Sequence, residues 1–130
     1  MLLTHKHWDH SGGNKDLREE FSDLIIVGSS RDFPENSCLN YFYCVNKRVQ
    51  DEEIFQVGRL IFRVLMAPCH TMGSVMYLLE MDKIVQNVAS AKECDYDQIL
   101  ELDAPSLFTG DTIFTGGAGK IHEQSTRAKR

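Results

Sequence analysis

The sequence predicts a mixed α/β fold in one domain. Its 130 residues are close to the commonest domain length, and 42% of them are hydrophobic, so the chain can form a core. Short β-branched runs bounded by glycine or proline indicate strands, whereas one segment near the start has the spacing of a helix. These two observations together predict a fold that contains both strands and helices.

The first part of the chain predicts a strand, a helix and a second strand. Residues 1–4 have the character of the end of a buried strand. Asn14 follows two glycines and is expected to cap a helix that runs to about Phe21. Residues 24–27 form a β-branched run that Gly28 closes, which is typical of a strand.

The middle of the chain predicts a β-hairpin followed by two separate strands. The apolar runs 54–57 and 60–66 are joined by Gly58-Arg59, and a glycine in a two-residue connection favours a tight turn. Residues 75–79 predict the next strand, and residues 107–108 predict the last one.

The domain is expected to span residues 1–121. Within it, the polar and acidic residues 82–106 are predicted to form a surface insertion. Residues 116–119 are rich in glycine and are predicted to form a flexible loop, and residues 122–130 are predicted to be a polar tail.

Charge and composition restrict the classes of partner. The net charge of −5 argues against nucleic acid as the main partner, and no apolar run is long enough to span a bilayer. None of the four cysteines forms a CxxC pair, so we expect no thiolate zinc site and a reducing compartment. We therefore expect a cytoplasmic protein, or a mitochondrial one if a targeting segment lies upstream. A monomer is expected, with association through exposed sheet edges as the alternative.

The densest chemical signal lies at His5, His7, Asp9 and His10. Imidazole and carboxylate groups are the ligands of catalytic zinc sites. Side chains alternate along an extended segment, so His5 and His7 point the same way and can reach one metal. A turn after Trp8 would let Asp9 and His10 face a second metal. The pattern predicts a metal site rather than a histidine-rich surface loop.

Two later residues complete a ligand set. His70 follows a predicted strand, within Pro68-Cys69-His70-Thr71, and Asp111 follows another, within Thr109-Gly110-Asp111-Thr112. Either residue alone would more often be a structural histidine or a turn aspartate. After the first motif they supply ligands from separate segments, and the two carboxylate oxygens of Asp111 suit a bridge between metals ~3.5–4 Å apart.

Together these motifs resemble the metallo-β-lactamase superfamily, whose THxHxDH, PxHT and GD elements fall here between residues 4 and 112. Trp8 and the run Ser11-Gly12-Gly13-Asn14 make the chain similar to the glyoxalase II (hydroxyacylglutathione hydrolase) branch, including its dyskinesia-associated paralogue. The resemblance implies an αββα sandwich. Because the first motif begins at residue 4, we expect a partial sandwich that lacks the N-terminal strands and the C-terminal helical domain.

The same resemblance implies a zinc-dependent thioester hydrolase. The expected substrate is an S-(2-hydroxyacyl)glutathione, which attack of a metal-bound hydroxide would convert to glutathione and a 2-hydroxy acid. Asp9 and Asp111 would be catalytic, and iron or manganese could replace zinc. The implied ligands are His5, His7, His70 and Asp111 for the first metal and Asp9, His10 and Asp111 for the second.

The resemblance also assigns residues near the end of the chain. Lys120 would bind the glycine carboxylate of glutathione, and His122, which replaces the family's tyrosine, would also contact substrate. Ser74 stands where relatives often carry a histidine. The family's further histidine ligand beyond Asp111 has no counterpart at the matching place, so the second metal site lacks its last histidine.

Two alternatives to the thioesterase remain open. Persulfide dioxygenases have a similar fold and hold one iron, and the incomplete second site favours such a mononuclear centre. Trp8 and the Gly-Lys pair ending at Lys120 favour the thioesterase instead. The second alternative is a truncated, non-catalytic isoform that acts as an interaction module, because lost strands would expose sheet edges and apolar faces.

Overall fold

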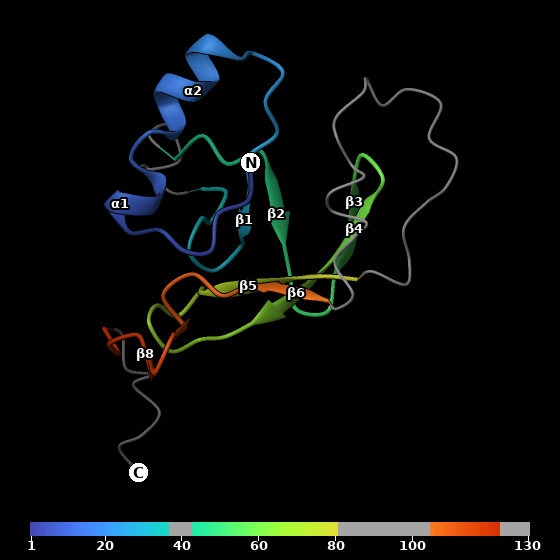
Figure 1. Cartoon of the computed structure of the whole chain (residues 1–130). Helices are drawn as coiled ribbons and strands as arrows, with labels where there is room; N and C mark the ends of the chain where they lie inside the picture. Colours follow the sequence, from blue (N-terminus) through green and yellow to red (C-terminus); the bar gives the residue numbers. More distant parts are fainter. Residues whose placement is uncertain (37–42, 81–104, 123–130) are drawn as a thin grey trace.

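A computed structural model of the chain describes residues 1–36, 43–80 and 105–122. This part contains a parallel pair of strands, a four-stranded antiparallel sheet and a small C-terminal hairpin (Figure 1). The elements in chain order are α1 (Trp8–Ser11), α2 (Asn14–Glu20), β1 (Val27–Ser29), β2 (Lys47–Val49), β3 (Ile54–Val57), β4 (Leu60–Met66), β5 (Val75–Leu79), β6 (Ser106–Phe108), β7 (Ile113–Phe114) and β8 (Gly117–Ala118).

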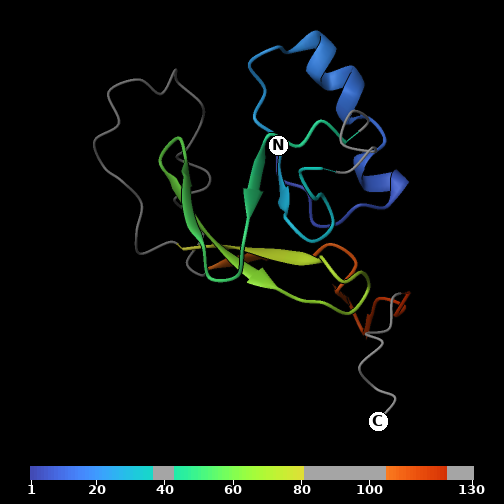
Figure 2. The ribbon, with the colours of Figure 1, turned by 180° about the vertical axis from the view of Figure 1, so that it is seen from behind.

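The parallel pair β1–β2 is extended by the start of the chain. The amide of Leu3 donates to the carbonyl of Val27 at 2.9 Å, and the amide of Val27 donates to the carbonyl of Met1 at 2.9 Å. The predicted strand at residues 1–4 is thus reduced to a short segment beside β1, which forms an isolated parallel bridge between Leu2 and Val27. Helices α1 and α2 lie on the side of this layer that faces away from the four-stranded sheet (Figures 1 and 2). Neither these helices nor any other in the described ranges could cross a membrane.

The four-stranded sheet has the order β3-β4-β5-β6, with every neighbouring pair antiparallel. The predicted hairpin is confirmed, since β3 and β4 have the expected bounds and Gly58 takes a φ of 59° in the turn between them. The predicted strand over residues 75–79 is confirmed as β5.

The core lies between the two sheets and on the outer face of β1. Because side chains alternate along a strand, Val27 packs into the layer between the sheets while Ile26 faces the opposite side. The first cluster holds Val27, Val49, Phe62, Val64, Val75, Tyr77 and Leu79, and the second holds Leu3, Ile26, Phe33 and Val45. The predicted α/β fold is thus observed as two packed sheets with helices beside the smaller one.

Two predicted boundaries near the start of the chain are wrong. Asn14 does not cap α2 but is its first residue, because its buried amide group instead donates to the carbonyl of Tyr43 at 2.6 Å. Strand β1 begins at Val27 rather than Leu24, since the amide of Ile26 is taken by the side chain of Asn46 at 2.8 Å.

Two predictions near the end of the chain also change, and most of a third lies outside the described residues. The surface insertion predicted over residues 82–106 ends before Ser106, because Ser106 belongs to β6 and pairs with Leu79. Residues 82–104 of that insertion lie outside the described residues. Gly117–Ala118 is strand β8 rather than a flexible loop, because it pairs with β7. Of the predicted tail, residues 123–130 lie outside the described residues, and His122 packs against other histidines.

Candidate metal centre

Three segments distant in sequence meet beside α1. The amide of Val75 donates to the carbonyl of Thr4 at 2.8 Å, which fixes the segment that carries His5 against β5. Gly110, with a φ of +51°, lies so close to Thr4 that an added Cβ would come within 2.4 Å of the Thr4 hydroxyl oxygen. Only glycine suits both the backbone conformation and the space, so the end of β6 delivers Asp111 beside the first motif.

The first group of ligand-type side chains comprises His5, His7 and His70. Their ring nitrogens offer one atom each within 4.8 Å of the others. The Nδ1 atom of His7 lies 2.9 Å from the Nε2 atom of His70. Three imidazoles that turn nitrogen atoms toward one point form a set of donors that zinc and iron accept.

His5 shows the clearest sign of an unsatisfied ligand atom. It is 1% exposed, and its Nε2 atom is buried without a hydrogen-bond partner, although Nδ1 lies 3.2 Å from the Thr4 hydroxyl oxygen. Such a buried polar atom costs about 1–3 kcal/mol unless a partner satisfies it. Burial, followed by repulsion from His10, His70 and His7, lowers the pKa of His5 to about 4. The ring is therefore neutral near pH 7, which is the form that binds a metal.

The second group comprises His5, His10 and Asp111, whose ligand atoms also lie within 4.8 Å of one another. One carboxylate oxygen of Asp111 is 3.2 Å from Nε2 of His10, and the other is 3.7 Å from Nε2 of His70. Asp111 thus faces both groups at once, which is the placement that a bridging carboxylate requires.

Asp9 lies at the rim of this second group. Its side chain is 76% exposed, and its carboxylate is 3.6 Å from Nε2 of His10. The structure groups His10 and Asp111 with His5 rather than with Asp9. The neighbouring Trp8 is 80% exposed, so the stretch that follows His7 borders the solvent.

His70 is oriented by the backbone at the end of the chain. Its Nδ1 atom is 2.8 Å from the carbonyl oxygen of Lys120, and a carbonyl can only accept, so Nδ1 carries the hydrogen. The lone pair of Nε2 is then free to face His7 and Asp111. Gly119 permits this arrangement, because a Cβ there would lie 1.6 Å from the carbonyl oxygen of Asp111.

Lys120 and His122, the predicted substrate contacts, lie on this same C-terminal segment. Lys120 is exposed. The ring of His122 lies 4.9 Å from that of His70 and 5.3 Å from that of His7, measured between centroids. All five histidines of the sequence therefore gather at one place, including His122, which was predicted as a substrate contact.

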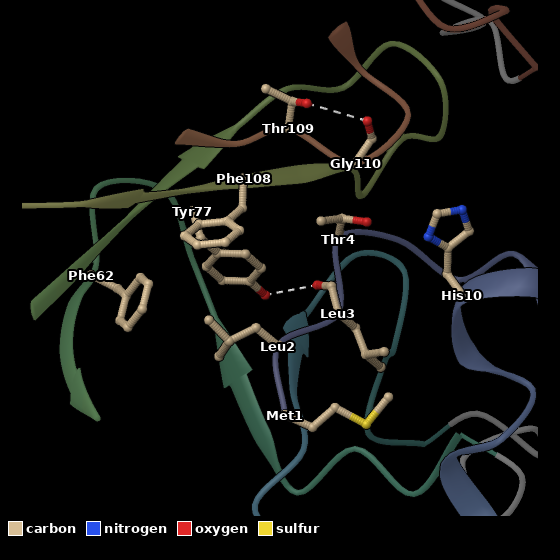
Figure 3. Close-up of a pocket in the computed structure, with 10 residues that line it drawn as sticks. All are labelled: Met1, Leu2, Leu3, Thr4, His10, Phe62, Tyr77, Phe108, Thr109 and Gly110. Atoms are coloured by element: carbon tan, nitrogen blue, oxygen red, sulfur yellow. Dashed lines mark hydrogen bonds between the residues drawn. The ribbon is translucent and has the colours of Figure 1, made fainter. Parts of the chain in front are cut away.

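An apolar pocket adjoins the second group (Figure 3). Its volume is about 450 Å³, and His10 and Thr4 lie together at one end of it. Farther in, the hydroxyl of Tyr77 donates to the carbonyl of Leu3 at 2.7 Å. The remaining lining residues are Met1, Leu2, Phe62, Phe108, Thr109 and Gly110.

Residues 1–85 match the family model described as the metallo-beta-lactamase superfamily. The chain belongs to the metallo-β-lactamase superfamily. Members with similar sequences include the hydroxyacylglutathione hydrolase of Dictyostelium discoideum, which is 32% identical over 95% of this chain. The cytoplasmic hydroxyacylglutathione hydrolase of Arabidopsis thaliana is 28% identical over the same share. The chain spans only 37% and 38% of the lengths of these two relatives.

Solved structures of superfamily members are similar to this one. The crystal structure of ETHE1 from Myxococcus xanthus has a TM-score of 0.59 and 28% identity, covering 95% of this chain and 40% of that one. A metallo-beta-lactamase from Staphylococcus aureus subsp. aureus COL has a TM-score of 0.62 at 24% identity, covering 99% of this chain and 32% of that one. The expected metallo-β-lactamase fold is thereby confirmed as a partial domain.

One buried residue at this site, Asp32, lies outside every sequence motif. Asp32 is 4% exposed and contacts the segments that carry His7 and His70. The residues around Asp32 show no clear hydrophobic periodicity and contain no recognisable motif. Its position depends on contacts with Lys6 and Thr71, 26 and 39 residues away, and local sequence carries no signal of these.

Proposed function

We propose that the chain provides the metal centre of a metal-dependent thioester hydrolase that converts S-(2-hydroxyacyl)glutathione to glutathione and a 2-hydroxy acid. The observation that carries this proposal is the position of Asp111, whose two oxygens face His10 and His70. A carboxylate between two histidine groups suits a two-metal hydrolase. The 32% identity to a hydroxyacylglutathione hydrolase supports the choice of substrate.

In this proposal the metal ions are zinc, and each ligand is assigned to one ion or to both by its position in the structure. His7 and His70 hold the first ion and His10 holds the second, while His5 and Asp111 lie within reach of both. Bound metal would supply an activated water and a Lewis acid for the carbonyl oxygen. Asp9, at the exposed rim, would orient that water or complete the second site.

The same proposal assigns the substrate contacts. Lys120 is exposed, and its backbone carbonyl contacts His70. Its ammonium group would therefore bind a glutathione carboxylate close to the metal centre. His122 would border the thioester, since its ring lies beside His7 and His70. The apolar pocket beside His10 leaves room for the acyl portion.

A direct assay tests the function. The chain would be loaded with zinc, and hydrolysis of S-lactoylglutathione would be followed at saturating substrate. We expect turnover that disappears in a His7→Ala variant and after chelation. Turnover equal to that of His7→Ala would contradict the proposal for this chain.

A single-iron persulfide dioxygenase is the second candidate. The observation that favours it is that His5, His7 and His70 form a group of their own, with an oxygen of Asp111 3.7 Å from His70. The likeness to the ETHE1 structure is consistent with this function. One equivalent of iron and oxygen uptake with a persulfide substrate would favour the dioxygenase, whereas two equivalents of zinc would favour the hydrolase.

We also propose that the protein acts in the cytoplasm as a monomer. The cytoplasmic relative from Arabidopsis thaliana supports the location, with a mitochondrial location as the alternative. Microscopy of the tagged protein and analytical ultracentrifugation test the two statements. A mitochondrial signal would contradict the first, and a stable dimer would contradict the second.

A further inference from the structure

We propose that Asp32 is a positioning residue of the metal centre, which fixes the separation of the segments that carry the histidine ligands. This inference rests on the proposed metal centre but not on the reaction that the centre performs. Asp32 lies just after β1 and touches no ligand side chain in the contacts that the structure gives. Its hydrogen bonds go instead to the residues that flank the ligands.

One oxygen of Asp32 is bonded to both ligand segments. Its Oδ2 atom accepts the backbone N–H of Lys6 at 3.0 Å and the hydroxyl of Thr71 at 2.7 Å. Lys6 stands between His5 and His7, and Thr71 directly follows His70. A single carboxylate atom thus joins the two segments whose histidines must converge on one metal, through a backbone N–H on one side and a side-chain hydroxyl on the other.

The hydrogen bonds around Thr71 have only one consistent direction. The Thr71 hydroxyl uses its hydrogen on Asp32, so at the 2.8 Å contact between the Thr71 and Ser74 hydroxyls the Ser74 group must donate. The Ser74 oxygen in turn accepts the backbone N–H of Thr71 at 3.0 Å. The Ser74 hydroxyl therefore donates to the Thr71 hydroxyl, which donates to the Asp32 carboxylate. This chain of hydrogen bonds gives Ser74 a structural role that the family resemblance does not assign.

The backbone of the same turn rests directly on Asp32. A Cβ added at Gly73 would lie 2.4 Å from the backbone nitrogen and from Oδ1 of Asp32. Any side chain at Gly73 would push the turn away from the carboxylate. The turn that carries His70 is therefore packed against Asp32 without room for a side chain between them.

The placement of Asp32 is also energetically unusual. Its side chain is 1% exposed, and its Oδ1 atom is buried without a hydrogen bond, although the ammonium group of Lys6 lies 3.9 Å away. A buried carboxylate with an unused acceptor is a costly way to connect two loops. A carboxylate oxygen is a strong acceptor, which suits a group that holds two ligand segments at a fixed spacing.

The test compares metal binding in four variants of the full chain. Asp32→Ala removes both bonds, Thr71→Val removes one, and Thr71→Ser keeps the hydroxyl. Asp51→Ala is the matched control, because the Asp51 carboxylate also accepts a backbone N–H, that of Met66 at 2.8 Å, but outside the ligand segments. The readouts are the Zn²⁺ dissociation constant by chelator competition, the visible absorption spectrum of the Co²⁺ form and a circular dichroism melt.

We expect Asp32→Ala to bind Zn²⁺ about 10–100-fold more weakly and to change the Co²⁺ spectrum, as loss of an outer partner of metal ligands does. Thr71→Val should show a smaller loss of the same kind, and Thr71→Ser and Asp51→Ala should match the wild type. A folded Asp32→Ala protein with wild-type affinity and an unchanged Co²⁺ spectrum would overturn the inference. If Asp32→Ala does not fold, equal affinities of Thr71→Val and Thr71→Ser would overturn it instead.

The outcomes also separate this inference from the proposed reaction. A wild-type chain that binds Zn²⁺ and responds to Asp32→Ala but hydrolyses no thioester would support the role of Asp32 and contradict the hydrolase. A wild-type chain that binds neither Zn²⁺ nor Co²⁺ would overturn both.

Discussion

The Nδ1 atom of His7 lies 2.9 Å from the Nε2 atom of His70, although 63 positions separate the two residues in the sequence. Because His70 directs its Nδ1 hydrogen to the Lys120 carbonyl, its Nε2 atom must accept a hydrogen from His7 when no metal is present. Two nitrogens that share a tetrahedral zinc at about 2.0–2.1 Å lie roughly 3.3 Å apart. Metal binding therefore needs His7 to carry its hydrogen on Nε2 instead of Nδ1, and the two rings to part by only about 0.4 Å.

The first prediction concerns this histidine pair. His70→Ala should weaken Zn²⁺ binding by more than the ~10–100-fold typical of outer partners, since it removes a direct ligand. His122→Ala is the control, because His122 belongs to neither ligand group although its ring lies beside both histidines. Isothermal titration with a competing chelator measures the affinities. Equal affinities for the two variants would contradict the ligand assignment.

The second prediction distinguishes the role of Asp111 in metal binding from that of Asp9. Asp111 faces both ligand groups, whereas the side chain of Asp9 is 76% exposed and has its carboxylate 3.6 Å from Nε2 of His10. Asp111→Asn should therefore reduce the bound zinc from two ions to one or none, while Asp9→Asn should keep at least the first ion. Metal analysis of dialysed protein gives the stoichiometry. A larger loss from Asp9→Asn than from Asp111→Asn would rule out the bridging role of Asp111.

The third prediction concerns pH. Burial and the neighbouring histidines lower the pKa of His5 to about 4, below the ordinary value of about 6.5 in an unfolded chain. The unfolded chain thus binds the extra proton first, so the contribution of His5 is fully present above pH ~6.5 and is lost as the pH falls toward 4.

Urea unfolding of the metal-free protein checks this. The free energy of unfolding should fall by about 2–3 kcal/mol between pH 7 and pH 4.5 through His5, because one pKa unit corresponds to about 1.4 kcal/mol. His5→Gln, which cannot titrate, should show a shallower dependence. Identical slopes for the two proteins would show that His5 is not the buried neutral group described above.

The fourth prediction compares two glycines of the C-terminal hairpin. Gly119→Ala would place a Cβ 1.6 Å from the Asp111 carbonyl oxygen, so the hairpin must shift, with a cost of about 1–3 kcal/mol and weaker zinc binding. Gly117→Ala meets nothing within 4 Å and should stay within about 0.5 kcal/mol of the wild type. Chemical denaturation and zinc titration measure both effects. A neutral Gly119→Ala would mean that the hairpin does not close on Asp111 as described.

Local sequence was enough to predict the elements that depend on local chemistry. The hairpin around Gly58 was predictable because a two-residue turn with glycine fixes the register of both strands. The convergence of His70 and Asp111 on the first motif was also foreseen, since both follow predicted strands and carry ligand-type side chains. The structure places His70 in one group and Asp111 in another, each with ligand atoms within 4.8 Å of one another, so that either group could hold a metal ion.

Features that depend on distant partners could not be predicted in this way. Asn14 has the sequence of a helix cap, but its amide is drawn to the Tyr43 carbonyl, 29 positions away. Asp32 has no local pattern, and its importance becomes visible only when Lys6 and Thr71 are placed beside it. In each case a long-range hydrogen bond overrode or replaced the local signal.

Because Trp8 is exposed beside the metal centre, its fluorescence can report on this site. The sequence contains one tryptophan, and that residue immediately follows His7 and is 80% exposed. Its emission therefore reports on a single location, without background from another indole. A paramagnetic ion such as Co²⁺ held by the adjacent histidine should quench that fluorescence, so loading of the site could be followed continuously in dilute solution without any label.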